Sequence, residues 1–338
     1  MEKPDVIVLG LGPAGASAAA AAARAGARVV ALDRKREAGI PVQCAELVPG
    51  PLYVDPAVVR QPVASMLTFV EDDAPDLNAV FPGRMLDRAA FDASLVDEAR
   101  RAGADVRFGS FVERISSTGV IHLADGETLR AAIVVGADGP RSRAGKAIGS
   151  INSEVVETRQ ITVPLLQPHA ATDIFLSAEI RGGYGWLFPK GNAANLGAGV
   201  APAFRARLKA IVSRLHATLI DEGRVKQSII STTGGAIPVG GMLKPWGRLG
   251  ETLVLLAGDA AGLANPVSGA GIAAAVHSGR LAGEAAVRGA AEEYEEELED
   301  VYGAALARAL ARRRELLEST MTKSALRRGW IAYPEYWT

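Results

Sequence analysis

A glycine-rich segment close to the start of the sequence has the residue types needed to hold a dinucleotide. Gly10, Gly12 and Gly15 give the pattern GxGxxG between an apolar run and an alanine-rich run. In a strand–turn–helix unit, the first glycine permits the tight turn and the second lets a pyrophosphate approach the backbone. The third lets helix and strand pack closely. Because the helix N-terminus also offers free N–H groups and a positive dipole to phosphates, the segment predicts a dinucleotide site that includes Pro13 and Ala14.

An acidic residue stands where such a site needs one. Asp33 lies 18 residues beyond Gly15, at the end of a second apolar run. A carboxylate at that point can accept hydrogen bonds from the diol of a ribose. A glycine turn without a ligand is the alternative, and the position of Asp33 favours the dinucleotide. The pattern does not separate NAD from FAD.

Two later segments favour a flavin. Residues 255–262, LLAGDAAG, place Asp259 just past the C-terminal end of a buried strand, and residues 266–272 are PVSGAGI. Ligands bind at that end of the strands in α/β sheets. A flavin needs an acceptor for its ribityl hydroxyls and a close backbone approach to its ring, whereas an NAD enzyme needs no such second site. Residues 135–140, VGADGP, also follow an apolar run. Each segment alone also fits an Asp-Gly turn.

These segments are positioned by a predicted βαβ unit at the start of the chain. Residues 6–9 form a short buried strand, an alanine-rich helix runs to about residue 25, and residues 28–32 form the next strand. Asp87 is expected to cap a helix that runs to about residue 102. Asp125 and Gly126 predict a hairpin turn. Short strands are expected nearby at 106–108, 120–123 and 132–135.

The middle of the chain has a more β-rich pattern. The elements expected from there onward are strands at 161–166, 174–180 and 195–200, a helix at 204–221, a strand at 252–257 and a helix at 271–288. The tail that follows is helical and rich in charge. Its acidic run, 292–300, and its basic run, 308–314, are expected on solvated helix faces.

This order of elements predicts an α/β fold, α+β overall, in which a Rossmann-type nucleotide-binding domain carries a β-rich substrate domain. The nucleotide-binding domain is discontinuous in the chain. We expect it to comprise residues 1–60, 85–150 and 242–290, the substrate domain to comprise 61–84 and 151–241, and a helical tail to comprise 291–338.

Composition excludes several classes of function. The net charge of −1 over 338 residues gives no basic field for nucleic acid. A single cysteine, Cys44, forms no intrachain disulfide and fits a reducing compartment. The four histidines show no ligand spacing, so no metal site is expected. The N-terminus does not resemble a signal peptide, and no segment is expected to span a membrane. A cytoplasmic protein is predicted, with peripheral contact to the inner face of a membrane left open.

Together, the three glycine-rich segments resemble the FAD superfamily that includes p-hydroxybenzoate hydroxylase. The resemblance covers most of the chain, with GxGxxG near the start, GADG in the middle and GDAAG late. It implies FAD as cofactor, with Asp33 at the adenosine ribose, Arg88 near the FAD and Asp259 at the ribityl chain. The cofactor-binding set expected on this basis is Gly10, Gly12, Pro13, Ala14, Gly15, Asp33, Arg34, Cys44, Ala45, Arg88, Val112, Asp138, Gly139, Asp259, Pro266, Gly269, Gly271 and Ile272, the last two contacting the flavin ring.

Within that superfamily, three segments resemble the geranylgeranyl reductase family, which reduces isoprenoid double bonds. They are PVQCAE at 41–46, GYGWLFPK at 183–190 and GGAIP at 234–238. The chain differs from the family pattern at Leu47, where a glycine is expected. It is also shorter than typical members after the last flavin segment. Despite these two differences, the three matching segments imply an apolar, isoprenoid-type substrate.

Three aromatic residues could form the walls for such a substrate. Tyr184, Trp186 and Phe188 alternate along a predicted strand and so share one face. A core stripe of the sheet is the alternative interpretation. Cys44, in the family segment, could act beside the flavin by steering substrate or relaying a proton, or it could be a small buried hydrophobe.

The end of the chain is unusually aromatic. Its residues could dock on the body, cover the pocket or touch a membrane, and docking is the favoured interpretation. They are Trp330, Tyr333, Tyr336 and Trp337.

The function predicted from the sequence is an FAD-dependent reductase that saturates carbon–carbon double bonds of an isoprenoid or other apolar substrate. NAD(P)H, a ferredoxin or another small carrier would supply electrons to what we expect to be a monomer. An FAD-dependent aromatic monooxygenase is the alternative enzyme, and it would need oxygen. An electron-transfer flavoprotein partner is an alternative of another class, but one cysteine cannot build the four-thiolate cluster that such a protein usually carries. A non-catalytic FAD sensor is a further alternative.

Overall fold

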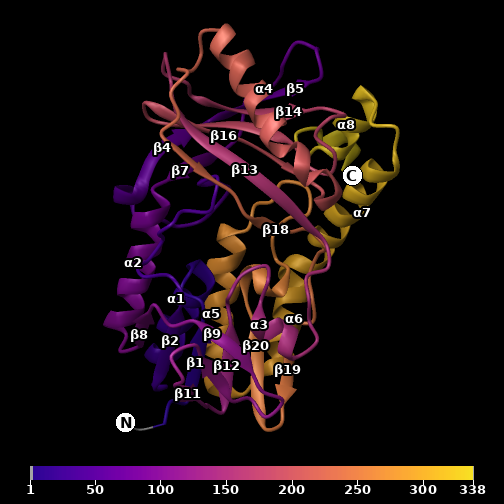
Figure 1. Ribbon diagram of the computed structural model, residues 1–338. Coiled ribbons are helices and arrows are strands. Elements are labelled where there is room, and N and C mark those ends of the chain that lie inside the picture. Colours follow the sequence, from indigo (N-terminus) through magenta and orange to yellow (C-terminus); the bar gives the residue numbers. More distant parts are fainter. Residues whose placement is uncertain (1–2, 338) are drawn as a thin grey trace.

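Two large sheets, one above the other, organise the chain, and the C-terminal helices run along one side of both (Figure 1). The computed structural model describes residues 3–337. One sheet has six strands in the order β19-β20-β12-β1-β2-β8. The other has eight, in the order β17-β13-β16-β15-β14-β5-β6, with β18 paired to β13. The expected Rossmann-type and β-rich parts are both present.

The six-stranded sheet is built from short apolar strands. Its parallel strands are β1 (Val6–Leu9), β2 (Val29–Asp33), β8 (Asp105–Phe108), β12 (Ile133–Gly136) and β20 (Thr252–Leu256), and β19 (Trp246–Leu249) is antiparallel. Every residue of β1 and β20 is buried. Such continuous burial is expected of parallel strands that are covered on both faces, and it explains why these strands lack an alternating pattern.

Helices α1 (Pro13–Arg24) and α5 (Ile272–Arg288) lie in backbone contact. A Cβ atom on Gly279 would lie 2.1 Å from the carbonyl oxygen of Ala14, and one on Gly283 would lie 2.3 Å from that of Ala18. Only glycine therefore allows the two helices to approach so closely. This contact brings their N-termini to the same side of the sheet, where both line one cavity.

The eight-stranded sheet is largely antiparallel, although β5 and β14 pair in parallel. Its strands are β5 (Ser65–Val70), β6 (Asp76–Asn78), β13 (Val155–Pro164), β14 (Ala171–Leu176), β15 (Gly185–Lys190), β16 (Ala193–Val200), β17 (Ser231–Thr233) and β18 (Ala236–Pro238). Helix α4 (Leu208–Asp221) covers one face and buries Leu208, Ile211 and Val212. The opposite face carries Trp186 and Phe188 toward the cavity.

Two small sheets and two more helices complete the body. One sheet consists of β3 (Leu47–Pro49), β4 (Val59–Val63) and β7 (Gly83–Leu86), and the other of β9 (Val112–Ile115), β10 (Ile121–Leu123) and β11 (Thr128–Leu129). Helix α2 (Arg88–Arg101) is capped as predicted, because the Oδ1 of Asp87 accepts a hydrogen bond of 3.0 Å from the amide of Ala90. Helix α3 comprises Arg143–Ala147.

Most of the expected elements are present, with shifted ends. Strand β13 starts at Val155, before the expected residue 161, and β14 stops at Leu176 because a turn from Ser177 to Ile180 follows. The expected helix at 204–221 begins with a 3₁₀ segment, Pro202–Arg207. Strands β3 to β7 had no individual counterpart in the sequence-based expectation. Strands β3, β6 and β7 have only three or four residues each, and β4 contains Pro62.

The tail is helical and docks on the body. Its elements are α6 (Ala291–Leu298), a π-helical segment (Glu299–Gly303), α7 (Ala304–Glu318), α8 (Lys323–Gly329) and a 3₁₀ turn (Pro334–Tyr336). Lys323 and Arg327 form ion pairs with Asp73, next to β6. The hydroxyl of Tyr333 donates to Asp76 at 2.6 Å. The docking expected for the aromatic tail is therefore present.

One residue of the basic run contradicts the expectation of a solvated helix face. The side chain of Arg313 points into the body, and the residue is only 7% exposed. Its Nη1 donates to the carbonyl oxygen of Gly182 at 2.6 Å and more weakly to that of Pro266 at 3.4 Å. Burial lowers the pKa of Arg313 to about 10, so its guanidinium stays charged at neutral pH. Two carbonyl oxygens from different parts of the body make this buried position tolerable.

Candidate active site

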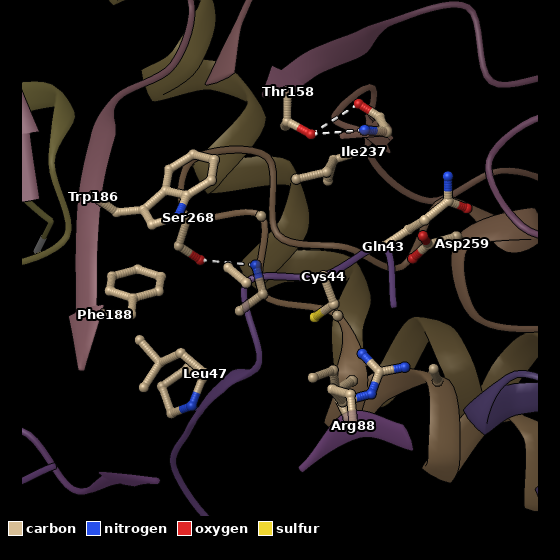
Figure 2. A pocket seen from close by; sticks show the side chains of 18 of the residues that line it. Gln43, Cys44, Leu47, Arg88, Thr158, Trp186, Phe188, Ile237, Asp259 and Ser268 are labelled. Atoms are coloured by element: carbon tan, nitrogen blue, oxygen red, sulfur yellow. Dashed lines mark hydrogen bonds between the residues drawn. The ribbon is translucent and has the colours of Figure 1, made fainter. Parts of the chain in front are cut away.

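A cavity of about 310 Å³ lies where the two large sheets meet. It is lined by the N-termini of α1 and α5, the segment 43–49, strands β13 to β15, residues 233–237 and two residues of the tail. Figure 2 shows Trp186, Phe188 and Leu47 on one side of it and Asp259 on the other, with Cys44 between them. The cavity therefore joins a polar, glycine-rich end to an apolar wall.

The glycines near the start of the chain divide into packing positions and one open position. A Cβ on Gly15 would lie 1.8 Å from the carbonyl oxygen of Gly10, and Gly10 itself has a φ of +91°. A Cβ on Gly12 would have no other described atom within 4 Å, and Gly12 lines the cavity. Gly10 and Gly15 thus shape the turn, while Gly12 leaves space for a ligand to approach the backbone.

Asp33 lies outside the cavity lining, at the end of β2. Its Oδ2 accepts a hydrogen bond from the amide of Leu11 at 2.7 Å, and its Oδ1 accepts one from the amide of Lys35 at 2.7 Å. The carboxylate therefore fixes the glycine-rich turn. Each carboxylate oxygen can accept further hydrogen bonds, so a ribose diol remains compatible with this position.

Asp259 carries an uncompensated carboxylate at the polar end of the cavity. No side chain or amide among residues 3–337 donates a hydrogen bond to it. Burial raises the pKa of Asp259 to about 6, and the Arg88 guanidinium offsets only part of that rise. A Cβ on Gly271, next to α5, would lie only 3.3 Å from its Oδ1. An unpaired, half-buried acceptor beside a bare helix N-terminus is suited to a ligand that brings its own hydroxyl groups.

Arg88 and Cys44 meet at the centre of the cavity. The guanidinium of Arg88 pairs with Asp92 one turn further along α2, at 3.0 Å, and also faces the sulfur of Cys44 (Figure 2). Burial raises the pKa of Asp92 although Arg88 lowers it. The Sγ of Cys44 accepts a hydrogen bond of 3.1 Å from the amide of Glu46. Cys44 is thus a partly exposed thiol held beside a fixed positive charge.

The three aromatic residues expected to form walls all line the cavity. The ring centroids are 5.7 Å apart for Tyr184 and Trp186, and 6.1 Å apart for Trp186 and Phe188. Trp186 and Phe188 also belong to the buried core, so the wall and the core stripe are the same surface. The hydroxyl of Tyr184 donates to the carbonyl oxygen of Ser268 at 2.6 Å, which ties this wall to the loop before α5.

The aromatic tail supplies a further wall. Trp330 is 3% exposed, its ring centroid lies 4.7 Å from that of Tyr184, and it lines the cavity together with Ile331. Trp337 donates its indole N–H to the carbonyl oxygen of Trp330 at 3.0 Å, which holds the end of the tail in place. The tail therefore both docks on the body and covers one end of the cavity.

The structure brings most of the expected site residues to the cavity and leaves some outside it. Those in the lining are Gly12, Pro13, Ala14, Cys44, Ala45, Arg88, Gly139, Tyr184, Trp186, Phe188, Asp259, Gly269, Gly271 and Ile272. Those outside it are Gly10, Gly15, Asp33, Arg34, Val112, Asp138 and Pro266.

Two of the outlying residues have other partners. The carboxylate of Asp138 accepts hydrogen bonds from the Oγ of Ser142 at 2.5 Å and the amide of Arg143 at 2.6 Å, so it supports Ser142, the N-cap residue of α3. The carbonyl oxygen of Pro266 accepts from Arg313.

Several polar residues that the sequence did not single out hold the segment around Cys44. Glu46 is 6% exposed and pairs with Lys190, and it accepts a hydrogen bond of 2.7 Å from Asn195. Both Glu46 and Lys190 lie inside the recognised segments, PVQCAE and GYGWLFPK. Their contact could have been predicted from opposite charges, because one segment contains an acid and the other a lysine.

Leu47 occupies the position where the family pattern has glycine. The left-handed residue is its neighbour Glu46, with a φ of +70°, whereas Leu47 begins strand β3. The backbone at Leu47 therefore does not require glycine. Its side chain instead lines the cavity close to Phe188 (Figure 2), so it occupies space that a glycine would leave open.

The residues at the polar end fit FAD. Two helix N-termini without a capping side chain, those of α1 and α5, meet there in the described chain. Gly12 and Gly139 line the cavity, and a Cβ on either would have no other described atom within 4 Å. Helix N-termini stabilise phosphates, the open glycines admit a close ligand, and the free Asp259 carboxylate matches a polyol.

Curated relatives of this chain are digeranylgeranylglycerophospholipid reductases. One from Methanococcoides burtonii is 32% identical over 320 residues, which cover 86% of this chain and 76% of the relative. One from Methanocella arvoryzae is 32% identical over 311 residues, which cover 82% of this chain and 76% of the relative. No family model matches the chain.

Solved structures share the whole architecture. A geranylgeranyl bacteriochlorophyll reductase-like protein from Thermoplasma acidophilum superposes with a TM-score of 0.84 at 25% identity, covering 98% of this chain and 92% of that one. A probable FAD-dependent monooxygenase from Pseudomonas aeruginosa gives a TM-score of 0.70 at 18% identity, with coverage of 96% and 98%. The fold is therefore that of the FAD-dependent oxidoreductases related to p-hydroxybenzoate hydroxylase, as the sequence predicts.

Asp259→Asn should stabilise the cofactor-free protein at neutral pH. The pKa of Asp259 is raised in the folded state, so ionisation opposes folding. This cost is absent at low pH, grows as pH rises past the unfolded value near 4, and is complete above about 6. We expect a gain of up to roughly 3 kcal/mol in the free energy of unfolding at pH 7. Urea unfolding of the wild type and the variant at pH 7 and at pH 4 measures this gain. An equal gain at pH 4 would show that the charge of the carboxylate is not the cause.

Gly15→Ala and Gly12→Ala should separate folding from ligand binding. The Gly15 variant forces a methyl group against a backbone oxygen that cannot move away, and it should lose about 3 kcal/mol of stability. The Gly12 variant has room for the methyl group and should unfold like the wild type, but should bind a dinucleotide about tenfold more weakly. Urea unfolding and dinucleotide titration report the two effects. Equal stability losses in both variants would contradict this division.

Proposed function

Since this chain belongs to the digeranylgeranylglycerophospholipid reductase family, we propose that it reduces carbon–carbon double bonds of an isoprenoid substrate with FAD as its cofactor. The observation that carries the proposal is the single cavity that joins the two helix N-termini to the aromatic wall. A flavin bound at the polar end would present its ring to an apolar chain lying along Trp186 and Phe188. Once bound and reduced by the electron donor, the flavin would supply the hydride for such a reduction.

The residues of the chain have separate tasks in this proposal. The two helix N-termini and Gly12 would hold the phosphates, and Gly271 would approach the ring edge. Asp259 would accept hydrogen bonds from the ribityl hydroxyls. Arg88 holds a positive charge beside the flavin site, where it favours a negatively charged reduced ring. The apolar wall excludes water from the reacting bond. Cys44, between the wall and Arg88, is the candidate for positioning the substrate or supplying a proton.

The electron donor is proposed to be NAD(P)H or a ferredoxin. Beyond the flavin site, the chain has no second complete nucleotide-binding pattern, which favours a donor that binds only transiently. We propose that the protein acts as a monomer, because one copy of the chain supplies residues for both the polar end and the apolar wall of the cavity.

Peripheral contact with a membrane is also proposed. In residues 3–337, no helix is both long and apolar enough to cross a bilayer. However, Tyr53, Leu77 and Val80 are exposed by 92%, 64% and 80%. They flank the segments that bring Pro49 and Phe81 to the cavity, where contact with lipid would give a long isoprenoid chain a route inward.

The proposal is tested by anaerobic turnover. The purified protein should release FAD on acid treatment, and with dithionite as reductant it should saturate double bonds of a geranylgeranyl lipid in the absence of oxygen. Mass spectrometry would detect each added pair of hydrogens. An oxygen-dependent hydroxylated product would instead identify a monooxygenase. Well-folded protein that releases NAD or no nucleotide would contradict the proposal.

Cys44→Ser and Cys44→Ala should differ in the rate of flavin reoxidation by substrate. If Cys44 supplies a proton, alanine should slow the reaction more than serine, because serine retains an exchangeable proton. If Cys44 only packs, the two variants should react at similar rates, because the site is partly exposed and the amide of Glu46 can donate to a serine hydroxyl as it does to the thiol. Stopped-flow absorbance measures the rate, with reduction by dithionite as control. Wild-type rates in both variants would exclude Cys44 from the chemistry.

A further inference from the structure

One buried amide connects the two functional surfaces of the cavity. Gln160 lies in β13, is 4% exposed and lines the cavity. Its Nε2 donates a hydrogen bond of 3.2 Å to the carbonyl oxygen of Cys44. Its Oε1 accepts one of 3.0 Å from the indole Nε1 of Trp186. Gln160 therefore holds the backbone of Cys44 and the ring of Trp186 at the same time.

The residue type at position 160 follows from this double contact. A carbonyl oxygen only accepts hydrogen bonds, and an indole N–H only donates them. A side chain that bridges the two must present one donor and one acceptor, which an amide does. A carboxylate offers no donor, and an apolar side chain offers neither. Loss of the amide would leave two polar groups unpaired inside the protein, which is costly.

Trp186 reaches Gln160 because the residue that lies between them in the sheet is a glycine. Gly197 in β16 lies between them, opposite Gln160 in β13 on one side and opposite Trp186 in β15 on the other. A Cβ on Gly197 would lie 2.4 Å from the Cζ2 of Trp186. The indole therefore lies across the bare backbone of β16, and its N–H can reach the amide two strands away.

Apart from Arg88, which faces the thiol itself, the neighbours of Cys44 are also held from the eight-stranded sheet and the segment before β18. Thr233 donates to the carbonyl oxygen of Val42 at 2.9 Å, and Asn195 donates to that of Ala45 at 3.1 Å. Within the described chain, Gln160 provides the contact to the carbonyl of Cys44 itself. It therefore sets how far the thiol stands from the aromatic wall.

We infer that Gln160 is a positioning residue that fixes the thiol of Cys44 relative to Trp186, and so fixes the reacting double bond of the substrate between them. The inference rests on the proposed function for the nature of the substrate. A displacement of either partner misaligns the bond with the flavin site without removing the apolar surface that binds the chain. The loss should therefore fall on kcat more than on KM.

The test uses Gln160→Met, which keeps the length of the side chain and removes both hydrogen bonds. Hydrogen exchange followed by mass spectrometry should show about fivefold faster exchange in peptides spanning residues 43–47, as expected for the loss of one hydrogen bond. With a geranylgeranyl lipid, kcat should fall about tenfold while KM changes by less than about threefold. FAD content should remain that of the wild type.

Two further variants separate positioning from a general disturbance of the sheet. Trp186→Phe removes the indole N–H together with one ring of the indole but leaves the hydrogen bond from Gln160 to Cys44, so exchange in residues 43–47 should stay within about twofold of wild type. The double variant should lose no more kcat than the more impaired single variant, because both act through one bridge. Thr172→Val in β14 is the matched control: its buried hydroxyl has no partner in the described structure, so exchange and turnover should not change.

Unchanged exchange in residues 43–47 of folded Gln160→Met would overturn the inference, and so would an unchanged kcat. Gln160→Leu provides the same measurements if the methionine variant does not fold. If the wild type fails to reduce the lipid, the proposed function is wrong. The positioning role is then decided by the exchange data alone, with faster exchange supporting it and unchanged exchange refuting it.

Discussion

Direct contact between backbone atoms at the start of the chain is the constraint on which the rest of the structure depends. Where β1, α1 and α5 meet, the carbonyl oxygens of Gly10 and Ala14 occupy the space that a Cβ on Gly15 or Gly279 would need. Backbone atoms cannot rotate away as side chains do, so these positions accept only glycine. The contact places the two helix N-termini, contributed by segments more than 250 residues apart in the sequence, at one cavity. The apolar wall of the eight-stranded sheet has a function only because the polar site below it is fixed in this way.

The two halves of the cavity are joined by polar contacts rather than by apolar packing alone. The segment around Cys44 leaves the six-stranded sheet and is held from the eight-stranded sheet by Gln160, by Asn195 and by the ion pair between the buried Glu46 and the partly exposed Lys190. Buried ion pairs contribute little net stability, but removing one partner is strongly destabilising. Such contacts therefore specify one arrangement of segment and sheet. Asp259 has the opposite character, because its unpaired carboxylate opposes folding until a ligand supplies hydroxyl groups.

The sequence predicts the nucleotide-binding half well and the other half less well. Gly10, Gly12 and Gly15 lie where strand, turn and helix leave little freedom, so a local pattern is sufficient. The contacts of Gln160 and Asn195 depend on which strands become neighbours, and pairing across β13, β16 and β15 cannot be inferred from alternation within one strand. Asp138 illustrates a related limit: its motif predicts a cofactor contact, but the local pattern does not reveal that its carboxylate also accepts hydrogen bonds from Ser142 and the amide of Arg143 at the start of α3. Arg313 was expected to be solvated because a run of like charges conceals one inward-facing position.

The position of Trp330 and Ile331 has a consequence for how the chain acquires its shape during translation. Both residues cover the cavity, and Arg313 connects α7 to the body through carbonyl oxygens of Gly182 and Pro266. A ribosome completes both sheets before it adds these residues. The aromatic face of β15 therefore stays uncovered while the last helices are still within the exit tunnel. During that interval the nascent polypeptide exposes an apolar surface that favours association with other molecules. A chaperone or a lipid can bind there before the protein's own tail covers it.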